Sequence, residues 1–152
     1  MRLLGRLKWP AIIAVVVGGC WLLSDSGVGY LHARWSFDAW SAQGADAAAA
    51  AANEARLTYL GGFLMNTMRF ELAEDVMVDA MRYEGENYWY NLYRLAKVKE
   101  KLDQPEAACE ILDTLMEENV NSRLDRRVPG NDVLDLRRSR LQEVHEVGAE
   151  AP

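Results

Sequence analysis

Two stretches of the chain decide its fold: LTYLGGFLMNTMRFELAEDVMVDA (residues 57–80) and LYRLAKVKEKLDQPEAACEILDTL (residues 92–115). In both stretches apolar residues recur at spacings of three and four, which is the period of an amphipathic α-helix. A small residue, Ala73 in the first stretch and Ala108 in the second, stands at the same place in the second predicted helix. These alanines are thirty-five residues apart. The sequence therefore predicts a repeated pair of helices.

The spacing in both stretches resembles the tetratricopeptide repeat (TPR), which has the pattern W-x2-L-G-x2-Y followed by A-x3-F and a period of 34 residues. A small residue on the second helix lets the first helix approach, while larger apolar residues fill the groove between stacked pairs. The first unit matches at Leu57, Leu60, Gly61, Leu64, Ala73, Met77 and Ala80, and the second at Leu92, Leu95, Ala96, Leu102, Ala108, Leu112 and Leu115. The chain departs from the pattern at Lys99, Gly85 and Asn119.

This resemblance covers residues 54–119 and implies two helical hairpins whose first helices line a groove for extended peptides. By the register of the repeat, four side chains are expected to face that groove: Thr58, Met65, Tyr93 and Lys97. The paired Lys and Asn pattern with which some members of the family hold a terminal carboxylate is absent. An equally open interpretation is that the preceding helices of this chain fill the groove.

The N-terminus predicts export or membrane insertion. Residues 1–8 form a basic region, and residues 9–24 follow without a charge. As a helix these sixteen residues span about 24 Å, against a bilayer core of about 30 Å. Trp9 and Trp21 stand near the two ends, where interfacial anchors are found. We therefore expect an uncleaved membrane anchor in contact with lipids.

A second interpretation of the same segment is lipidation. The tetrapeptide Val17-Gly18-Gly19-Cys20 resembles a bacterial lipobox, in which the chain is cleaved before the Cys and the Cys is lipidated. Plain cleavage as a signal peptide is the third possibility. In all three cases the basic residues precede the apolar run, so residues 25–152 are expected to face away from the cytoplasm. The predicted location is the bacterial inner membrane, single-pass, with the body in the periplasm.

The rest of the body also predicts helices, and the fold class is all-α. Residues 25–53 read as a juxtamembrane helix through Tyr30 and Trp40, followed by an Ala-rich start of a helix that runs to about Thr67. Within residues 120–148 a turn at 128–132 precedes a helix that we expect to cap the repeat array. Its predicted apolar stripe consists of Val133, Leu134, Leu136, Leu141, Val144 and Val147. Residues 149–152 are expected to be frayed.

Composition excludes several functions. The net charge is −6, and residues 1–23 hold three of the 17 Lys and Arg, which leaves 14 basic against 23 acidic residues in the remainder. An acidic body argues against nucleic acid as a partner. Cys20 and Cys109 form no disulfide framework or zinc motif, and no catalytic or cofactor motif surrounds His32 or His145. We expect no enzyme activity, no metal and no cofactor.

Two further surfaces are candidates for protein binding. In the aromatic run 88–93, Trp89, Leu92 and Tyr93 can face the core together, which leaves Tyr90 as the candidate for an exposed contact. Between residues 123 and 140 arginines outnumber acids, and we expect docking to involve Arg137, Arg138 and Arg140. That face could serve a homo-oligomer, an acidic partner or lipid headgroups. The alternative is a solvated helix surface.

Repeat number favours a role in protein interaction. About three repeats are needed for independent stability, so two need a cap, flanking helices or another protein. We expect a membrane-anchored, periplasm-facing scaffold or accessory subunit that mediates protein–protein interaction in a larger membrane or envelope complex. The alternative is a peptide- or client-binding adaptor with an open groove.

Overall fold

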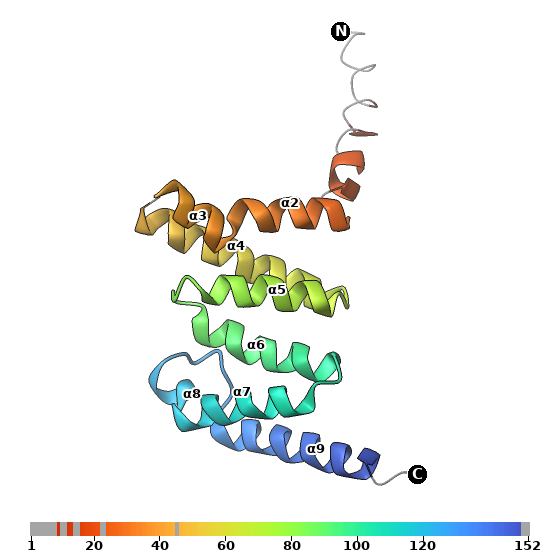
Figure 1. The fold of residues 1–152 in the computed structure, drawn as a ribbon, viewed down its shortest axis with the longest axis vertical. Helices are drawn as coiled ribbons and strands as arrows, with labels where there is room; N and C mark the ends of the chain where they lie inside the picture. The colour runs from red at the N-terminus through yellow and green to blue at the C-terminus, as the bar shows by residue number, and fades with distance from the viewer. Residues whose placement is uncertain (1–8, 10–11, 14–15, 22–23, 45, 150–152) are drawn as a thin grey trace. The chain divides into compact units, whose positions relative to one another are not determined.

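The computed structural model describes residues 9, 12–13, 16–21, 24–44 and 46–149, without the side chains of 145–149. The chain forms two compact units, Met1–Trp35 and Ser36–Pro152. In these described ranges every regular element is a helix and no strand occurs, which confirms the all-α prediction (Figure 1).

The first unit contains helical residues at 9, 12–13 and 16–21, followed by α2, Asp25–Trp35. The side chains of Trp9 and Trp21 are exposed, and so is the free thiol of Cys20. The expected basic region 1–8 and residues 10–11, 14–15 and 22–23 of the expected anchor lie outside the described residues. Among the residues that are described, no helix combines the length and apolar character needed to cross a membrane.

A break at Ser36 divides the single helix that the spacing from Tyr30 to Trp40 predicts. Helix α3, Phe37–Gln43, begins after Ser36, whose Oγ accepts a hydrogen bond from the N–H of Ala39 at 3.2 Å. The carboxylate of Asp79, on α5 (Phe70–Met81), also accepts the N–H of Phe37 at 3.3 Å. These acceptors satisfy N–H groups that a helix start leaves without partners. A local capping residue and a distant carboxylate therefore fix the start of α3.

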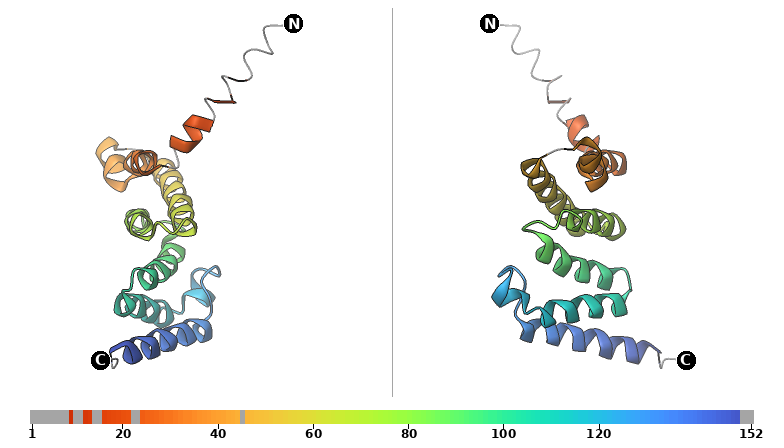
Figure 2. Two further views of the ribbon diagram at one scale, coloured as in Figure 1. Left: turned by 90° about the vertical axis from the view of Figure 1, so that its right-hand side faces the viewer. Right: turned by 60° about the vertical axis from the view of Figure 1, so that its left-hand side comes forward.

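Four helices form two antiparallel hairpins: α4 (Ala47–Asn66) with α5 (Phe70–Met81), and α6 (Tyr88–Lys101) with α7 (Pro105–Glu117). Asp46 caps α4 by accepting the N–H of Ala49 at 2.9 Å. Within this unit α4 and α6 lie on one side, and α5 and α7 on the other (Figure 2). The Ala-rich run lies in α4, as the sequence predicts.

The turns repeat with the same period as the marker alanines. Four non-glycine residues adopt positive φ, one after each helix from α4 to α7: Met68, Glu84, Asp103 and Asn119. Met68 and Asp103 are thirty-five residues apart, as are Glu84 and Asn119. The residue that follows Met68 and the residue that follows Asp103 each donate their N–H to the carbonyl five residues before them, at 2.9 Å in both hairpins. The repeat therefore extends from the side-chain pattern to the backbone.

Most positions of the repeat pattern lie in the core. Ala73 and Ala108 are fully buried, as the packing argument predicts. The absence of a side chain at Gly61 makes room for Met77, because a Cβ at position 61 would lie 2.9 Å from Cγ of Met77. Five large side chains of the pattern are also fully buried: Leu57, Leu64, Met77, Leu112 and Leu115.

The C-terminal part covers the second hairpin. A short helix that the sequence analysis missed, α8 (Val120–Arg123), precedes α9 (Asn131–Ala149), which packs on α7. Leu134 of α9 joins the core cluster with Val120 and Val128. The predicted apolar stripe of α9 is only partly correct, because Val133, Leu136 and Val144 are 50 to 68% exposed. The side chain of Val147 is outside the described residues.

Candidate binding groove

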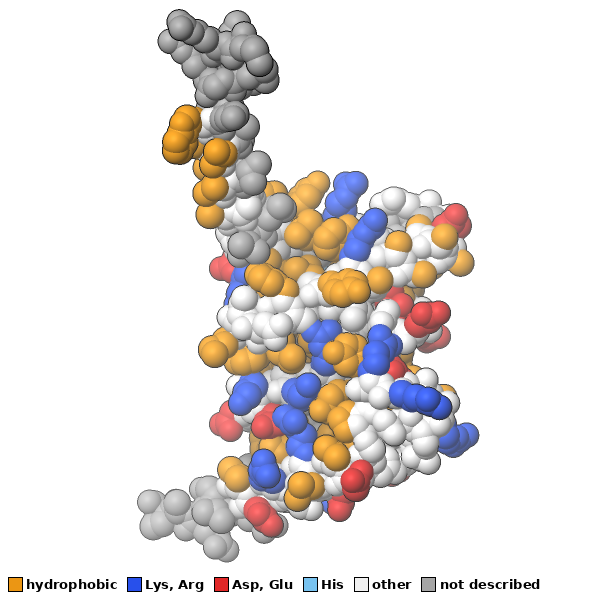
Figure 3. All heavy atoms as spheres, turned by 180° about the vertical axis from the view of Figure 1, so that it is seen from behind, with side chains coloured by type: hydrophobic (Ala, Val, Ile, Leu, Met, Phe, Trp, Pro, Cys, Tyr) orange, Lys and Arg blue, Asp and Glu red, His pale blue; other side chains and the backbone are white. Residues whose placement is uncertain are grey.

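An open cavity of about 570 Å³ lies between α4 and α6, the first helices of the two hairpins. Its lining combines aromatic, amide and guanidinium side chains: Ala55, Thr58, Tyr59, Gly62, Phe63, Asn66, Asn87, Tyr90, Arg94 and Arg127. Figure 3 views the molecule from the side on which α4 and α6 lie, and Lys and Arg side chains lie there among hydrophobic ones. Tyr59 is 81% exposed, so the cavity has an aromatic side chain available at its surface.

Arg94 is a buried residue in the lining of this cavity. It is only 5% exposed, and its Nη1 donates a hydrogen bond to the backbone carbonyl of Thr58 at 2.8 Å. Its guanidinium carbon lies 5.3 Å from the ring centroid of Tyr90. Gly62 makes room for the guanidinium, because a Cβ at position 62 would lie 2.1 Å from Nη2 of Arg94. In this arrangement a glycine in the interior of α4 leaves the space that a side chain of α6 occupies.

Arg94 carries a charge that no carboxylate balances. It forms no ion pair with any residue in the described part of the chain, although a guanidinium has five N–H donors. Burial lowers the pKa of the Arg94 guanidinium, yet an arginine remains protonated in proteins. The cavity therefore holds one buried and uncompensated positive charge.

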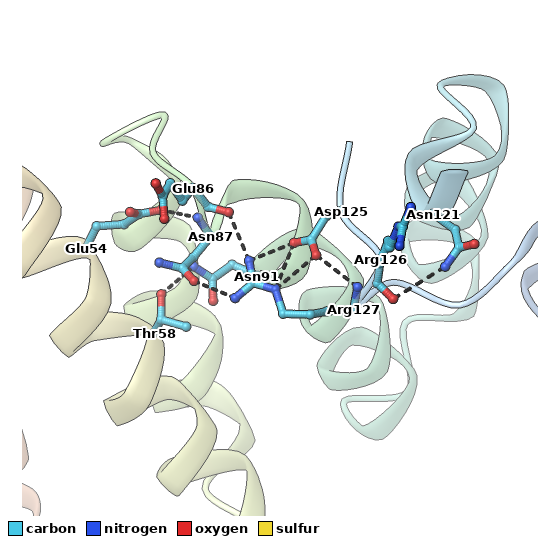
Figure 4. A network of polar contacts seen from close by, with 9 residues as sticks. All are labelled: Glu54, Thr58, Glu86, Asn87, Asn91, Asn121, Asp125, Arg126 and Arg127. Atoms are coloured by element: carbon cyan, nitrogen blue, oxygen red, sulfur yellow. Dashed lines mark hydrogen bonds and ion pairs between the residues drawn. The ribbon is translucent and has the colours of Figure 1, made fainter. Parts of the chain in front are cut away.

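The second guanidinium of the cavity, Arg127, is fully engaged. Its Nη2 lies 2.7 Å from Oδ2 of Asp125, and its Nη1 donates to Oδ1 of Asn87 at 2.8 Å (Figure 4). Burial by itself would raise the pKa of Asp125, but hydrogen bonds from the side chain and backbone of Arg127 hold this pKa below its usual value. Arg127 lies over the ring of Tyr90, at 4.8 Å from the centroid. Asp125 thus neutralises Arg127 within the loop that precedes α9.

A neighbouring pocket of about 460 Å³ shares Ala55 and Asn87 with the cavity and has acidic residues in its wall. Glu54 is 2% exposed and accepts the backbone N–H of Asn87 at 2.8 Å, at the start of α6. Gly85 leaves space for this carboxylate, since a Cβ there would lie 2.2 Å from Oε2 of Glu54. An acid at a helix N-terminus is favourable, so Glu54 has a structural role. Glu86 also lines this pocket.

A buried amide contact joins α4 and α6 beside the cavity. Asn91 is fully buried, and its Nδ2 donates to Oγ1 of Thr58 at 2.8 Å (Figure 4). The Oδ1 of Asn91 has no hydrogen-bond partner among the described residues. Together with Arg94, Asn91 fixes the spacing of the two helices that form the walls.

The structure brings together only part of the predicted groove. Thr58 lines the cavity but is itself buried, whereas Met65, Tyr93 and Lys97 do not line it. Tyr93 packs against the core cluster that includes Leu134 of α9, and Nζ of Lys97 lies 4.4 Å from the Tyr93 ring centroid. Burial lowers the pKa of Lys97, and Arg137 and Arg94 lower it further. This face of α6 therefore packs against a core cluster to which the C-terminal part contributes.

The structure agrees only in part with the predicted division of the aromatic run. Trp89, Leu92 and Tyr93 pack against the core cluster, while Tyr90 is half-buried in the wall of the cavity. The groove-facing side chains of α6 are thus Tyr90 and Arg94, three residues before the pair that the repeat register suggests.

The predicted basic face serves mainly to attach α9. Nη2 of Arg137 lies 2.5 Å from Oε2 of Glu100 on α6, and Nε of Arg138 lies 2.6 Å from Oδ1 of Asp113 on α7. Arg140 is exposed. Two of the three arginines are therefore already paired within the unit.

Sequence reasoning missed the residues that give the cavity its character: Tyr59, Gly62, Phe63, Arg94 and Arg127. One signal was present, because Gly62 follows the Gly61 of the repeat pattern and has no role in that pattern. A second glycine inside a helix suggests a close approach by another group. The partner, Arg94, is separated from it by thirty-two residues, and only the packing of α4 on α6 identifies it.

In the part of the chain that the structure describes, no group of three or more His, Cys, Asp and Glu residues could hold a metal ion. The chain matches no protein-family model, no curated protein sequence and no solved structure.

Proposed function

We propose that this protein is a TPR-like interaction module that binds an extended segment of a partner protein in the groove between α4 and α6. The observation that carries the proposal is the open cavity of about 570 Å³ between the first helices of successive hairpins. Exposed Tyr59 and Phe63 form its rim, and aromatic side chains are enriched where proteins bind one another. The function is binding without catalysis.

The repeat geometry supports the TPR-like part of this proposal. The left-handed turn residues and the buried alanines recur with a spacing of thirty-five residues, close to the family period of 34. Only two such hairpins are present in the described part of the chain, and α9 covers the end of the second. A short array of this kind presents one groove of limited length.

The location of the module belongs to the same proposal. Residues 1–24 are basic and then apolar, and this order favours a membrane-anchored protein whose body faces the periplasm. A lipid anchor on Cys20 is the alternative form of attachment, and the thiol of Cys20 is free and exposed. Either form would hold the groove close to partners at the membrane.

A second candidate function is a scaffold or accessory subunit of a larger membrane or envelope complex. The observation that favours it is the exposed apolar set on α9: Val133, Leu136 and Val144. End helices of a helical array normally present a polar outer face. An apolar one suggests that another subunit stacks on α9.

One experiment separates the two functions. The full chain with a C-terminal tag is extracted in mild detergent, and partners that co-purify are identified by mass spectrometry with their stoichiometry. We expect Tyr59→Ala/Phe63→Ala to lose the partner and Leu136→Asp to retain it. Val78→Ala, at an exposed apolar position of α5, is the matched control. Loss with Leu136→Asp and retention with the groove variant would replace the groove proposal by the scaffold.

A further inference from the structure

We propose that Arg94 binds the side-chain carboxylate of an aspartate or glutamate in the partner segment, so that the groove selects an acidic residue at one fixed position. This inference rests on the proposed function, because it assigns the chemistry of the ligand to the same groove. It starts from the one charge in the cavity that the protein itself leaves unbalanced.

The burial of the Arg94 charge indicates that a ligand would supply an anion. Removing a cation from water is unfavourable unless an anion or several acceptors replace the water. Arg94 is 5% exposed and, among the residues that the structure describes, has a single hydrogen-bond acceptor, the carbonyl of Thr58. Arg94 is one of the residues that line the open cavity. A ligand that supplies an anion there would complete the pairing that the fold lacks.

The chemistry of the site favours a carboxylate. A planar guanidinium fits a carboxylate through two parallel hydrogen bonds. The second arginine, Arg127, is paired with Asp125 at 2.7 Å, so the net charge available to a ligand is that of Arg94 alone. One uncompensated positive charge matches a monoanion better than a phosphate dianion. Tyr59 and Tyr90 supply flanking surfaces for the carbon atoms of the same residue.

The shape and charge of the groove favour a residue inside the segment over a chain terminus. The cavity adjoins a second pocket through Ala55 and Asn87, so a bound chain can continue past Arg94. In that second pocket Glu54 and Glu86 repel a further acid. The ligand should therefore carry an acidic residue beside Arg94 and avoid acids where it crosses the second pocket.

The test is a selection of short random peptides on the purified full chain, with both peptide ends fused to a display scaffold so that no terminal carboxylate is free. We expect Asp or Glu to be enriched at one position with the wild-type protein and with Arg126→Met. Arg126 is exposed and does not line the cavity, which makes it the matched control. With Arg94→Met the acidic preference should disappear, while Arg94→Lys should retain part of it.

A second measurement does not depend on how well the Arg94 variants fold. A selected peptide and its Glu→Gln analogue are titrated against the wild-type protein by fluorescence polarisation, and we expect the analogue to bind at least about tenfold more weakly. Equal affinities, or an acidic preference that persists in Arg94→Met, would overturn the assignment to Arg94. Arg94-dependent binding of an acid-free peptide through its free C-terminus would overturn the choice of a side chain.

The outcomes distinguish the inference from the function on which it rests. Peptides that bind the groove with no preferred acidic position would overturn the role of Arg94 and leave the binding function intact. If no peptide is enriched and Tyr59→Ala/Phe63→Ala changes no co-purified partner, the proposed groove function is itself wrong, and this inference fails with it.

Discussion

Gly62 of α4 and Arg94 of α6 fit together so closely that a Cβ on the glycine would lie 2.1 Å from Nη2 of the arginine. The arginine in turn donates to the Thr58 carbonyl at 2.8 Å, so the two helices are joined at this point. The same contact sets the packing of the hairpins and orients the charge of the cavity. Stability and the proposed binding would therefore be coupled at one pair of residues.

The first prediction concerns Gly62→Ala. Helix propensity alone would stabilise α4 by about 1 kcal/mol. Because the new methyl group must displace the buried Arg94, we expect a net destabilisation of about 1–3 kcal/mol in urea unfolding. In an Arg94→Ala background the same substitution should become stabilising.

The control for this cycle is Gly29→Ala, since a Cβ at Gly29 of α2 meets nothing within 4 Å. We expect Gly29→Ala to be neutral or slightly stabilising. If the effects of Gly62→Ala and Arg94→Ala simply add, the steric account of Gly62 is wrong.

A second prediction concerns pH and the loop that carries Arg127. The pKa of Asp125 is lowered in the folded state, so its contribution to stability is present above the unfolded pKa, near 3.9, and is lost as pH falls through the folded value. At pH 7 we expect Asp125→Asn to reduce the free energy of unfolding by about 1–2 kcal/mol. Urea unfolding at pH 7 and in acid, for wild type and variant, measures this contribution. The two proteins should converge in acid, and an unchanged difference would contradict the account.

The marker alanines provide a third prediction. Ala73 and Ala108 are fully buried where paired helices approach, so Ala108→Leu should overpack the second hairpin and cost about 1–3 kcal/mol. Ala52→Leu, at an exposed position of α4, should change stability by less than about 0.5 kcal/mol. Thermal unfolding followed by circular dichroism compares them. Similar effects at both positions would show that the alanine is not a packing requirement.

A fourth prediction concerns the attachment of α9. Arg137→Glu breaks the ion pair with Glu100 and places two acids together, and because this pair is about one-third exposed the expected loss is about 1 kcal/mol. The charge exchange Arg137→Glu/Glu100→Arg should recover most of it. Arg140→Glu, at an exposed arginine, should have little effect on stability. Hydrogen exchange of the α9 amides reports whether the helix detaches.

The sequence by itself determined most of the helices, the repeat spacing and the marker positions, because these depend on local periodicity and on the need to bury apolar faces. Ala73 and Ala108 occupy equivalent buried sites, and α4 begins in the Ala-rich run, as predicted. Asp79 shows where local reasoning stops. It caps α3 from α5, forty-two residues away, and although Ser36 is itself a local capping residue, no local pattern indicates the contact with Asp79.

Only the tertiary structure decided which face of α6 is available for binding. The register of the repeat places Tyr93 in the groove, whereas helical spacing places Tyr93 toward the core and leaves Tyr90 exposed, and the sequence does not choose between the two. Tyr93 packs against the core cluster that includes Leu134 of α9, whereas Arg94 lies against Gly62 and beside the ring of Tyr90. Local periodicity fixes a helix and its apolar face, but the partner of each remaining face depends on packing between elements distant in the chain.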